Sequence, residues 1–531
     1  MTNSFSEFAN AKMFMVIGSN MVEAHPVAAT YVKNAVMKGA QLIVVDPRRH
    51  ALADLATLHV PIRVGSDIAL LNALSHVLIA EGLYDKKFVE SCTIDFDKLE
   101  DKVRTYPPER AADICGISAE MIRDLARLIA SVKPMMLCYT LGITEHTCGK
   151  NNVQAVANLQ MLLGNLGVEC GGVNPLRGQN NVQGACDMGA LPNVFPGYQT
   201  VAAPDYRAKF AKAWNVESLP DKPGLMIPQM MEGLTSGKVR GFYVFGENLA
   251  NTEPDIRKVE HELDSAEFLV VQDIFPNETT RFAHVVLPAA AWSENDGTFT
   301  NSERRVSRVR TASRPPGLAK PNWWIFRELA RRMGQAWPTD SAQTIWDDEV
   351  SVLAPQLCGI KYHRLEADGL QWPCPDESHE GTCFLHKDGQ FSCGLGIFTP
   401  VEWTPPAEEV CADYPLVLST GRRLTHYHTR TQTGRCEGLN DLLGEETADI
   451  SPHDAAELNI RDGEIVRVRS RRGEVRIKAR VTARVPRGLV WMSFHFRDTC
   501  ANWLTNPAFD PSTLTAEYKA CAVRIEKAEA G

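Results

Sequence analysis

The sequence has 531 residues, of which 44% are hydrophobic and 23% are charged, and its formal net charge is −9. This length exceeds a single hydrophobic core, so we expect about three or four domains. The negative charge argues against nucleic acid as the main partner. No apolar run approaches the ~20 residues that span a bilayer and no signal-peptide pattern is visible, so we expect no direct membrane insertion and, by default, a cytoplasmic protein.

The first elements predict a strand, a helix and a second strand. Residues 12–20 (KMFMVIGSN) form an apolar run that ends in a glycine turn, residues 21–40 have helical periodicity, and residues 41–49 (QLIVVDPRR) end near Asp46. A βαβ unit binds ligands at the carboxyl ends of its strands. Because the turn is G-S-N and not G-x-G-x-x-G, a generic α/β unit without a nucleotide explains this stretch equally well.

The same order of elements recurs further along the chain. Residues 241–248 (GFYVFGEN) form an apolar run ending at Gly246, and residues 267–275 (EFLVVQDIF) end near Asp273. The interval from Gly246 to Asp273 is nearly the same as the interval from Gly18 to Asp46. Two such units predict paired domains with equivalent crevices, in which the glycine admits a phosphate or sugar and the aspartate accepts hydrogen bonds from it. The alternative is chance similarity between two common βαβ units.

The middle of the chain combines helices with polar loops. We expect helices over residues 116–133, with Ser118 as N-cap, and over residues 153–167. The segment NPLRGQNNVQGACDMG (174–189) follows the second helix. Fourteen cysteines are present without C-x-x-C spacing, so we expect no iron–sulfur cluster, structural zinc or other metal site in this chain. Residues 337–412 read as loop-rich and residues 399–415 as a linker.

The carboxyl-terminal part predicts a small closed β-barrel. Residues 414–423 form a strand, residues 451–459 a capped helix with Pro452 in its first turn, and residues 460–496 alternate apolar and charged side chains as antiparallel strands do. The arginines of this stretch could suggest an RNA-binding surface. No aromatic residues interleave with them, which favours a solvated strand face.

The assembled motifs identify a family resemblance over essentially the whole chain. The most specific are NPLRGQNNVQGACDMGALP, HVVLPAAAWSENDGTFTNSERR, QWPCP, STGRRLTHYHTRTQTGR and EYKACAVRIE. They resemble the catalytic (alpha) subunits of molybdenum or tungsten formate dehydrogenases, which belong to the bis-molybdopterin-guanine-dinucleotide oxidoreductases. The resemblance implies a multidomain α/β molybdopterin oxidoreductase fold with two related Rossmann-like halves and a C-terminal β-barrel. The expected domains are residues 1–178, 179–290, 291–407 and 408–531.

The resemblance also implies a bis-molybdopterin guanine dinucleotide cofactor carrying molybdenum or tungsten, which the sequence does not distinguish. The residues expected at the nucleotide end of one dinucleotide are Gly18, Asn20, Asp46, Arg48, Gly65 and Asp67. Those expected at the other are Gly246, Glu247, Asn248, Gln272 and Asp273. Those expected in the capping barrel are Thr420, Arg422, His426, His428, Asn502, Tyr518 and Lys519. Gln179 and Asn181 are expected to contact the pterin. Each of these could instead serve only its own turn or a neighbouring side chain.

Arg177 matches the family's substrate-orienting arginine. Formate offers only two oxygens to grip, and the planar, permanently charged guanidinium matches a carboxylate. The implied reaction is the reversible oxidation of formate to carbon dioxide. Electrons are expected to pass to iron–sulfur, hydrogenase or NAD-reducing flavoprotein subunits. The alternative for Arg177 is a buried ion pair between the two halves.

One departure from the family is large. Its amino-terminal segment carries a [4Fe–4S] cluster and a metal-ligating selenocysteine or cysteine with an adjacent histidine, and none of these motifs is present in this sequence. We expect an in-frame UGA codon upstream and a chain that is inactive by itself. The rival interpretations are another bis-molybdopterin oxidoreductase, such as a nitrate reductase, and a non-catalytic cofactor-binding remnant.

Overall fold

The computed structural model describes residues 1–528, and its contacts divide the chain into two compact units. The first unit comprises Met1–Leu176, Leu249–Glu260 and the chain from Phe384 onward, and the second comprises Arg177–Asn248 and His261–Cys383. Each unit combines stretches that are distant in sequence, and the four predicted domain ranges remain a prediction. No helix within residues 1–528 combines the length and apolarity required to cross a membrane.

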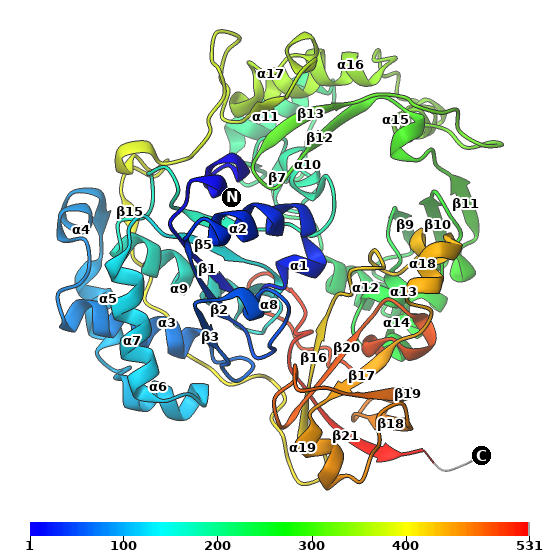
Figure 1. Ribbon diagram of the computed structural model, residues 1–531. Helices are drawn as coiled ribbons and strands as arrows, with labels where there is room; N and C mark the ends of the chain where they lie inside the picture. The colour runs from blue at the N-terminus through cyan, green and yellow to red at the C-terminus, as the bar shows by residue number, and fades with distance from the viewer. Residues whose placement is uncertain (529–531) are drawn as a thin grey trace. The chain divides into compact units, whose positions relative to one another are not determined.

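The first unit is built on a five-stranded parallel sheet (Figure 1). Its strand order is β3 (Leu58–Val60), β2 (Gln41–Val45), β1 (Met13–Ile17), β5 (Met136–Tyr139) and β6 (Val173–Pro175). Its main helices are α2 (Pro26–Met37), α3 (Asp67–Ala80), α7 (Ala119–Ser131) and α9 (Gly149–Leu162). Shorter helices are α1 (Met21–Ala24), α4 (Lys86–Cys92), α5 (Phe96–Val103), α6 (Pro108–Cys115) and α8 (Leu141–Thr144).

Alternate residues of β1 supply two separate cores. Phe14 and Val16 pack in the core that contains the buried side chains of α2, and Met15 and Ile17 pack in the core that contains those of α3, α7 and α9. A parallel sheet covered on both faces needs such a continuous apolar run. The predicted first βαβ unit and the two predicted central helices are confirmed, and Ser118 caps α7 by accepting a hydrogen bond from the Met121 nitrogen.

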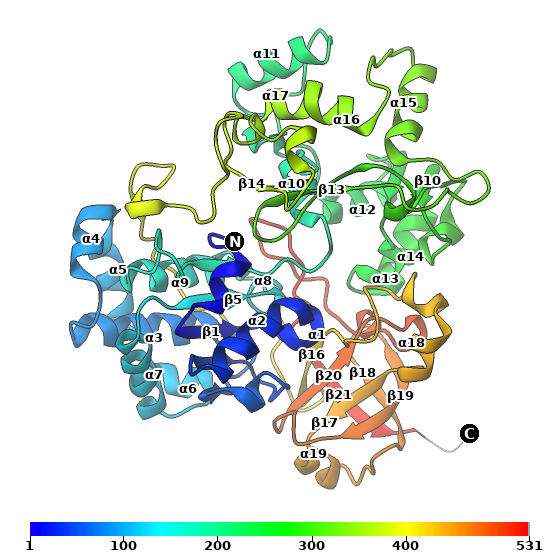
Figure 2. The same ribbon diagram turned by 45° about the horizontal axis from the view of Figure 1, so that its top comes forward.

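A closed six-stranded barrel is the second main part of the first unit (Figure 2). Its strand order is β16 (Leu416–Gly421), β20 (Leu489–Ser493), β17 (Thr447–Ile450), β19 (Glu474–Val481), β18 (Ile465–Arg469) and β21 (Cys521–Lys527). The barrel and the capped helix α19 (Pro452–Glu457) are confirmed. The antiparallel pairing predicted within residues 460–496 is confirmed for β18 and β19. Two pairs that include strands outside that range, β16–β20 and β17–β19, are parallel.

The predicted linker at residues 399–415 is a packed strap across the first unit. The Trp403 indole nitrogen donates to the Gly65 carbonyl at 2.9 Å, and the Trp403 backbone nitrogen donates to the Tyr106 hydroxyl oxygen at 2.8 Å. Val401 is buried in the sheet's core. These contacts make the segment part of the fold and not a free linker.

The second unit contains two small sheets. One is parallel, in the order β11 (Val285–Pro288), β10 (Phe268–Asp273) and β9 (Gly241–Phe245), and confirms the second pair of predicted strands. The other is antiparallel, in the order β12 (Gly297–Thr300), β13 (Arg305–Val309) and β14 (Leu370–Gln371). Its helices include α10 (Val182–Asp187), α11 (Pro204–Ala213), α12 (Ile227–Thr235) and α15 (Asn322–Arg332). Residues 337–383 hold short helical turns and the two-residue strand β14, as their loop-rich composition predicts.

Candidate functional site

The two glycine turns predicted to be equivalent are built in the same way. Gly18 has φ +56° and Gly246 has φ +64°, a left-handed conformation that glycine adopts without strain. The Gly18 nitrogen donates to the Val45 carbonyl at 3.0 Å, and the Gly246 nitrogen donates to the Gln272 carbonyl at 2.9 Å. In both units the acceptor is the residue just before the predicted aspartate, so each turn is fixed to the neighbouring strand at the same point.

Buried polar atoms without partners gather behind the first turn. Among residues 1–528, the Ser19 hydroxyl, both polar atoms of the Asn20 amide and the Nε atom of Arg48 are inaccessible to solvent and find no hydrogen-bond partner. Most buried polar groups in folded proteins are satisfied. A cluster of unsatisfied donors and acceptors at the carboxyl end of a parallel sheet is therefore suited to a polar ligand.

Arg48 connects this turn to the barrel. Its side chain is 9% exposed, its guanidinium lies 3.7 Å from the Trp491 ring centre, and its Nη2 atom lies 4.0 Å from Asp449. Burial lowers the pKa of Arg48, while Glu23 and Asp449 oppose that shift. The predicted residue is thus a nearly buried cation at the boundary of sheet and barrel.

Asp46 and Asp67 differ in environment. Asp46 accepts from the Arg48 backbone nitrogen at 2.9 Å, and the buried His50 ring, both of whose nitrogens lack hydrogen bonds, lies 3.8 Å from its carboxylate. Asp67 begins α3 and is 5% exposed. Burial raises the pKa of Asp67 to about 6, with His146 opposing the shift. Gly65, at φ +77°, lies against Pro406 of the strap.

Arg422 and His428 occupy a loop that follows β16. The Arg422 guanidinium lies 4.5 Å from the Phe494 ring centre, and no carboxylate within residues 1–528 forms an ion pair with it. Burial lowers its pKa. Burial, and secondarily Arg422, lowers the pKa of His428 to about 3. A desolvated guanidinium without a carboxylate partner is a candidate ligand for an anion.

The other predicted barrel residues are already engaged. Both ring nitrogens of His426 have partners, namely the Thr433 hydroxyl and the Leu443 carbonyl. The side chains of Asn502 and Tyr518 both donate hydrogen bonds to the Thr252 carbonyl. Lys519 forms an ion pair with Glu145 and donates a hydrogen bond to the Thr420 carbonyl. The Thr420 hydroxyl donates to the Tyr518 carbonyl at 3.0 Å. These side chains hold neighbouring backbone in place, and their contact with a cofactor remains a prediction.

In the second unit the predicted residues around Gly246 also bond one another. Asn248 contacts Glu278 and Thr279, and Gln272 accepts from Tyr243 and donates to Asn322 at 2.8 Å. Asp273 accepts from its neighbour's nitrogen and from Asn277. Burial, with Asp273 adding to it, raises the pKa of Glu247. The polar atoms here are largely satisfied by protein, in contrast to those behind Gly18.

The central segment supplies Arg177, Gln179 and Asn181. The Arg177 backbone nitrogen donates to the Ser302 hydroxyl at 3.0 Å, and its Nη1 donates to the Cys186 sulfur at 3.5 Å. Asn181 has φ +62° and accepts from the Thr300 nitrogen at 3.0 Å. Gln179 is half-buried. The central segment is therefore fixed by hydrogen bonds to residues 300–302.

Sequence reasoning missed four residues of these sites. Ser19 and His50 stand beside predicted residues, and their position next to Gly18 and Arg48 could have indicated them. Cys186 lies within the central motif, where nothing in the sequence pattern indicates a role for it. Trp491 sits in an apolar strand, where nothing in the sequence distinguishes it from an ordinary core residue.

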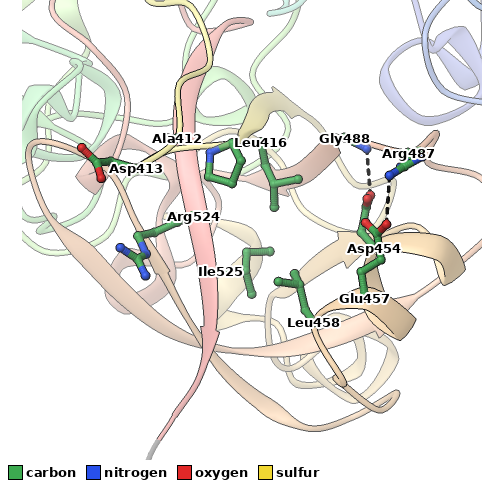
Figure 3. A pocket seen from close by; sticks show the side chains of 11 residues that line it. Ala412, Asp413, Leu416, Asp454, Glu457, Leu458, Arg487, Gly488, Arg524 and Ile525 are labelled. Carbon is green, nitrogen blue, oxygen red and sulfur yellow. Dashed lines mark hydrogen bonds and ion pairs between the residues drawn. The ribbon is translucent and has the colours of Figure 1, made fainter.

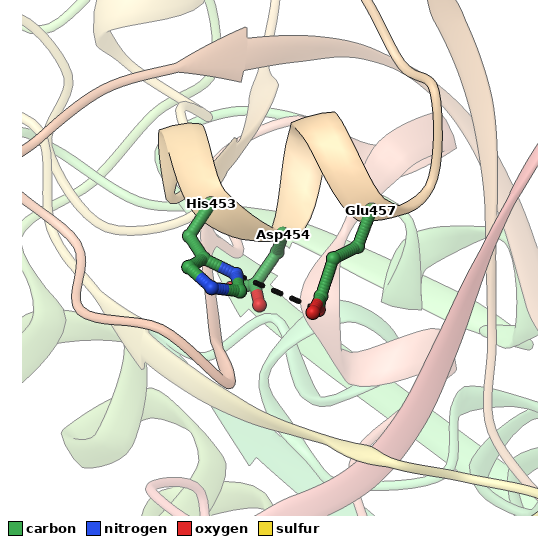
Figure 4. Close-up of side chains that lie close together, drawn as sticks. All are labelled: His453, Asp454 and Glu457. Atoms are coloured by element: carbon green, nitrogen blue, oxygen red, sulfur yellow. Dashed lines mark ion pairs between the residues drawn. The ribbon is translucent and has the colours of Figure 1, made fainter.

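A separate cavity of about 360 Å³ lies on the barrel, away from the predicted residues (Figure 3). Near it, His453, Asp454 and Glu457 could together hold a metal ion (Figure 4). Protein groups already neutralise them, because Asp454 accepts from the Gly488 nitrogen at 2.8 Å and Glu457 pairs with Arg487 at 2.9 Å. A cation would have to displace these contacts, so we assign no metal here.

Comparisons with known proteins agree on one family. Residues 1–332 match the family described as Molybdopterin oxidoreductase, and residues 416–522 match the Molydopterin dinucleotide binding domain, which corresponds to the barrel. The F420-dependent formate dehydrogenase subunit alpha of Methanocaldococcus jannaschii is 45% identical, covering 99% of this chain and 78% of that protein. Formate dehydrogenase H of Escherichia coli is 41% identical, covering 99% of this chain and 74% of that protein.

A solved structure supports the same fold. Acetylene hydratase from Pelobacter acetylenicus superposes with a TM-score of 0.75 at 19% identity, covering 99% of this chain and 79% of that chain. At this identity the likeness concerns the fold alone. The two formate dehydrogenase relatives carry residues beyond the part that this chain matches.

Proposed function

The chain belongs to the molybdopterin oxidoreductase family, and we propose that it is the catalytic polypeptide of a formate dehydrogenase. The observation that carries the proposal is its 41–46% identity, over nearly its whole length, to proteins of that name. The family matches establish a molybdopterin dinucleotide cofactor. That there are two dinucleotides, carrying molybdenum or tungsten, is part of the proposal.

The residues behind Gly18 fit a dinucleotide. The unpartnered polar atoms of Ser19 and Asn20 can meet a guanosine or phosphate, and the buried Arg48 can offset phosphate charge. Arg422, which forms no ion pair within residues 1–528 although the more distant Glu145 carboxylate acts on its charge, can do the same from the barrel. We propose Glu247 and Asp273 for the second nucleotide, where protein contacts would have to rearrange.

When bound, the cofactor supplies a metal centre that takes up two electrons. This chain's contribution to the reaction is the binding and orientation of formate, and Arg177 is the residue we assign to it. Formate is an anion and carbon dioxide is neutral. A guanidinium therefore binds the substrate more strongly than the product, which favours product release as well as orientation. The overall change is formate to carbon dioxide, one proton and two electrons.

We also propose that the protein ligand to the metal and the [4Fe–4S] cluster come from a segment outside this chain. The motifs that would carry them in the family do not occur in the sequence. The cofactor-loaded chain by itself should then bind formate without turning it over. Electrons would leave through that cluster to an iron–sulfur, hydrogenase or flavoprotein partner. Turnover by the loaded chain alone would contradict this part of the proposal.

The test is the formate-dependent reduction of a viologen dye by the assembled enzyme, with nitrate reduction assayed in parallel. Arg177→Lys should lower formate kcat/KM about a hundredfold, because lysine lacks the two parallel N–H donors of the guanidinium. The metal content should be retained. Arg310→Lys is the matched control, since Arg310 is exposed in the same unit and pairs with Glu366. Unchanged formate kinetics in Arg177→Lys would reject the substrate role. Activity with nitrate alone would favour the nitrate reductase alternative, and cofactor binding without either activity would favour the remnant.

A further inference from the structure

Charged side chains gather on one outer face of the barrel, where β18 lies between β19 and β21 (Figure 1). Buried and more exposed positions alternate along these strands, and the more exposed positions carry the charges. We call the arginine face the block formed by Arg467, Arg469, Arg476, Arg524, Glu474 and Glu526. Further along β19, Lys478 and Arg480 each pair with a carboxylate of another segment. The arginine face is thus an excess of positive charge on a chain whose formal net charge is −9.

The strand register places like charges opposite one another on this face. Arg467 of β18 lies opposite Arg476 of β19, and Arg469 of β18 lies opposite Arg524 of β21. Like charges in directly opposed positions destabilise a sheet. The stability of the barrel therefore does not account for these four arginines.

The two glutamates of the arginine face supply too little negative charge for it. The carboxylate of Glu526 lies 2.5 Å from the guanidinium of Arg524 and 3.4 Å from that of Arg467. It also lies 3.9 Å from the guanidinium of Arg469, which pairs with Glu474 at 3.2 Å. One carboxylate therefore serves three guanidiniums, and only one of the three is at close range.

Arg467 and Arg476 hold the donors that these glutamates leave over. Arg476 is exposed and forms no ion pair within residues 1–528. The Nε atom of Arg467 is inaccessible to solvent and finds no hydrogen-bond partner among the same residues. A guanidinium binds a carboxylate through two parallel N–H donors. The opposed pair can therefore receive carboxylates that this part of the chain does not provide.

We propose that the arginine face is a docking surface for an acidic segment of a partner protein, one rich in aspartate and glutamate. Carboxylates of such a segment would neutralise the opposed arginines and set the orientation of the partner. This inference goes beyond the proposed function and does not depend on the substrate. Nucleic acid fits this face less well, because β18, β19 and β21 carry no aromatic side chain on which a base could stack. A membrane also fits less well, because Ile465 is the only large apolar side chain exposed on these three strands.

The primary experiment measures the binding of a short fluorescein-labelled poly-L-glutamate to the intact chain by fluorescence anisotropy. The double variant Arg467→Gln/Arg476→Gln removes one opposed pair and should weaken binding about tenfold. The matched control, Arg484→Gln/Arg487→Gln, removes the same charge from the same barrel at two exposed arginines, each paired with one carboxylate outside the face. The control should keep the affinity within about twofold of wild type, and sodium chloride should weaken wild-type binding.

Thermal unfolding separates docking from a structural role of the same arginines. The midpoint temperature of Arg467→Gln/Arg476→Gln should equal or exceed that of wild type, because the substitution removes two opposed like charges. A clearly lower midpoint would show that these arginines hold the barrel together, and would count against docking. If the double variant does not fold, Arg476→Gln decides, because this exposed side chain forms no ion pair within residues 1–528. That single variant should weaken poly-L-glutamate binding about threefold.

The remaining outcomes are equally decisive. Equal affinities in wild type and Arg467→Gln/Arg476→Gln, or equal weakening in both double variants, would overturn the inference. Tighter binding of a single-stranded oligodeoxynucleotide, or of phosphatidylserine vesicles, lost in the same double variant, would reject the acidic protein as the occupant. Formate turnover by the assembled enzyme should be unchanged in Arg467→Gln/Arg476→Gln. A failure of the docking proposal is therefore distinguishable from a failure of the proposed function.

Discussion

The guanidinium of Arg48 lies 3.7 Å from the centre of the Trp491 ring, so the turn after β2 and the barrel strand β20 meet at a single stacked pair. The guanidinium of Arg423 lies 4.6 Å from the centre of the same ring and bonds the buried carboxylate of Glu446. The indole thus lies between the sheet and a buried ionic network of the barrel. A ligand bound behind Gly18 would touch both parts of the first unit.

Arg48→Met tests whether this cation serves a nucleotide. Methionine preserves much of the apolar packing on Trp491 but removes the charge, so the affinity of the cofactor-free protein for GDP should fall roughly tenfold or more. Isothermal titration calorimetry measures it. Arg49→Met is the control, because Arg49 is the next residue and its half-exposed side chain pairs with Asp54. Equal GDP affinity in both variants would remove Arg48 from the nucleotide site.

Local patterns were sufficient to predict much of the fold. The apolar runs of β1 and β2 are as continuous as buried parallel strands require, whereas β9 is largely exposed and β10 is buried in its middle. Gly18 and Gly246 mark the turns that follow β1 and β9. Alternation predicted the hairpin of β18 and β19. It could not predict the parallel pairs β16–β20 and β17–β19, because alternation gives the face of a strand and not its partner.

The site was less accessible to sequence reasoning for a physical reason. Arg48 and Trp491 lie far apart in the chain, and the strap residue Trp403 is likewise distant in sequence from Gly65. Such contacts follow from tertiary packing, which leaves no local periodicity. The family resemblance supplied Arg177, whereas the sulfur acceptor beside it emerged only from the geometry.

Gly18→Ala should be much more damaging than an alanine at another left-handed glycine. A Cβ at Gly18 would lie 2.8 Å from the backbone of Gly142, in addition to the strain at φ +56°. Gly82 has φ +68° with nothing within 4 Å. We expect Gly82→Ala to cost about 1–2 kcal/mol and Gly18→Ala a further 1–3 kcal/mol. The midpoint temperature of thermal unfolding should be lower for Gly18→Ala than for Gly82→Ala. Equal midpoints would show that the turn at Gly18 can relax.

Asp67→Asn should change how stability depends on pH. The folded-state pKa of Asp67, about 6, exceeds its ordinary value of 3.8, so the fold favours the protonated form. The protonated Asp67 therefore contributes to the free energy of unfolding at low pH. This contribution, about 3 kcal/mol, is lost as the pH rises from about 4 to about 6. Urea unfolding of the cofactor-free protein should find Asp67→Asn more stable than wild type at pH 7.5 and equal at pH 4.

The exposed Asp54 provides the control for that measurement. Desolvation acts to raise the pKa of Asp54, but the hydrogen bonds and positive charges of Arg484 and Arg49 together outweigh it and lower the pKa. Asp54→Asn should therefore gain no stability at pH 7.5. Parallel pH curves for wild type and Asp67→Asn would mean that Asp67 is charged without penalty in the fold.

His495 should make the first unit sensitive to acid. Its Nε2 accepts from the Arg423 backbone nitrogen at 2.9 Å, which requires that nitrogen to be unprotonated, and its Nδ1 donates to the His428 carbonyl. Burial lowers the pKa of His495 to about 3 from 6.5. Below pH 6.5 this ring takes up a proton in the unfolded chain but not in the folded chain. The free energy of unfolding of the wild type should therefore fall by about 2 kcal/mol between pH 7.5 and pH 5 because of this ring. His495→Gln, which does not titrate, should lose correspondingly less stability over that range in urea unfolding, whereas His363→Gln at an exposed ring should follow wild type. Identical losses in His495→Gln and wild type would show that the ring accepts a proton in the fold, and that its bond to Arg423 gives way.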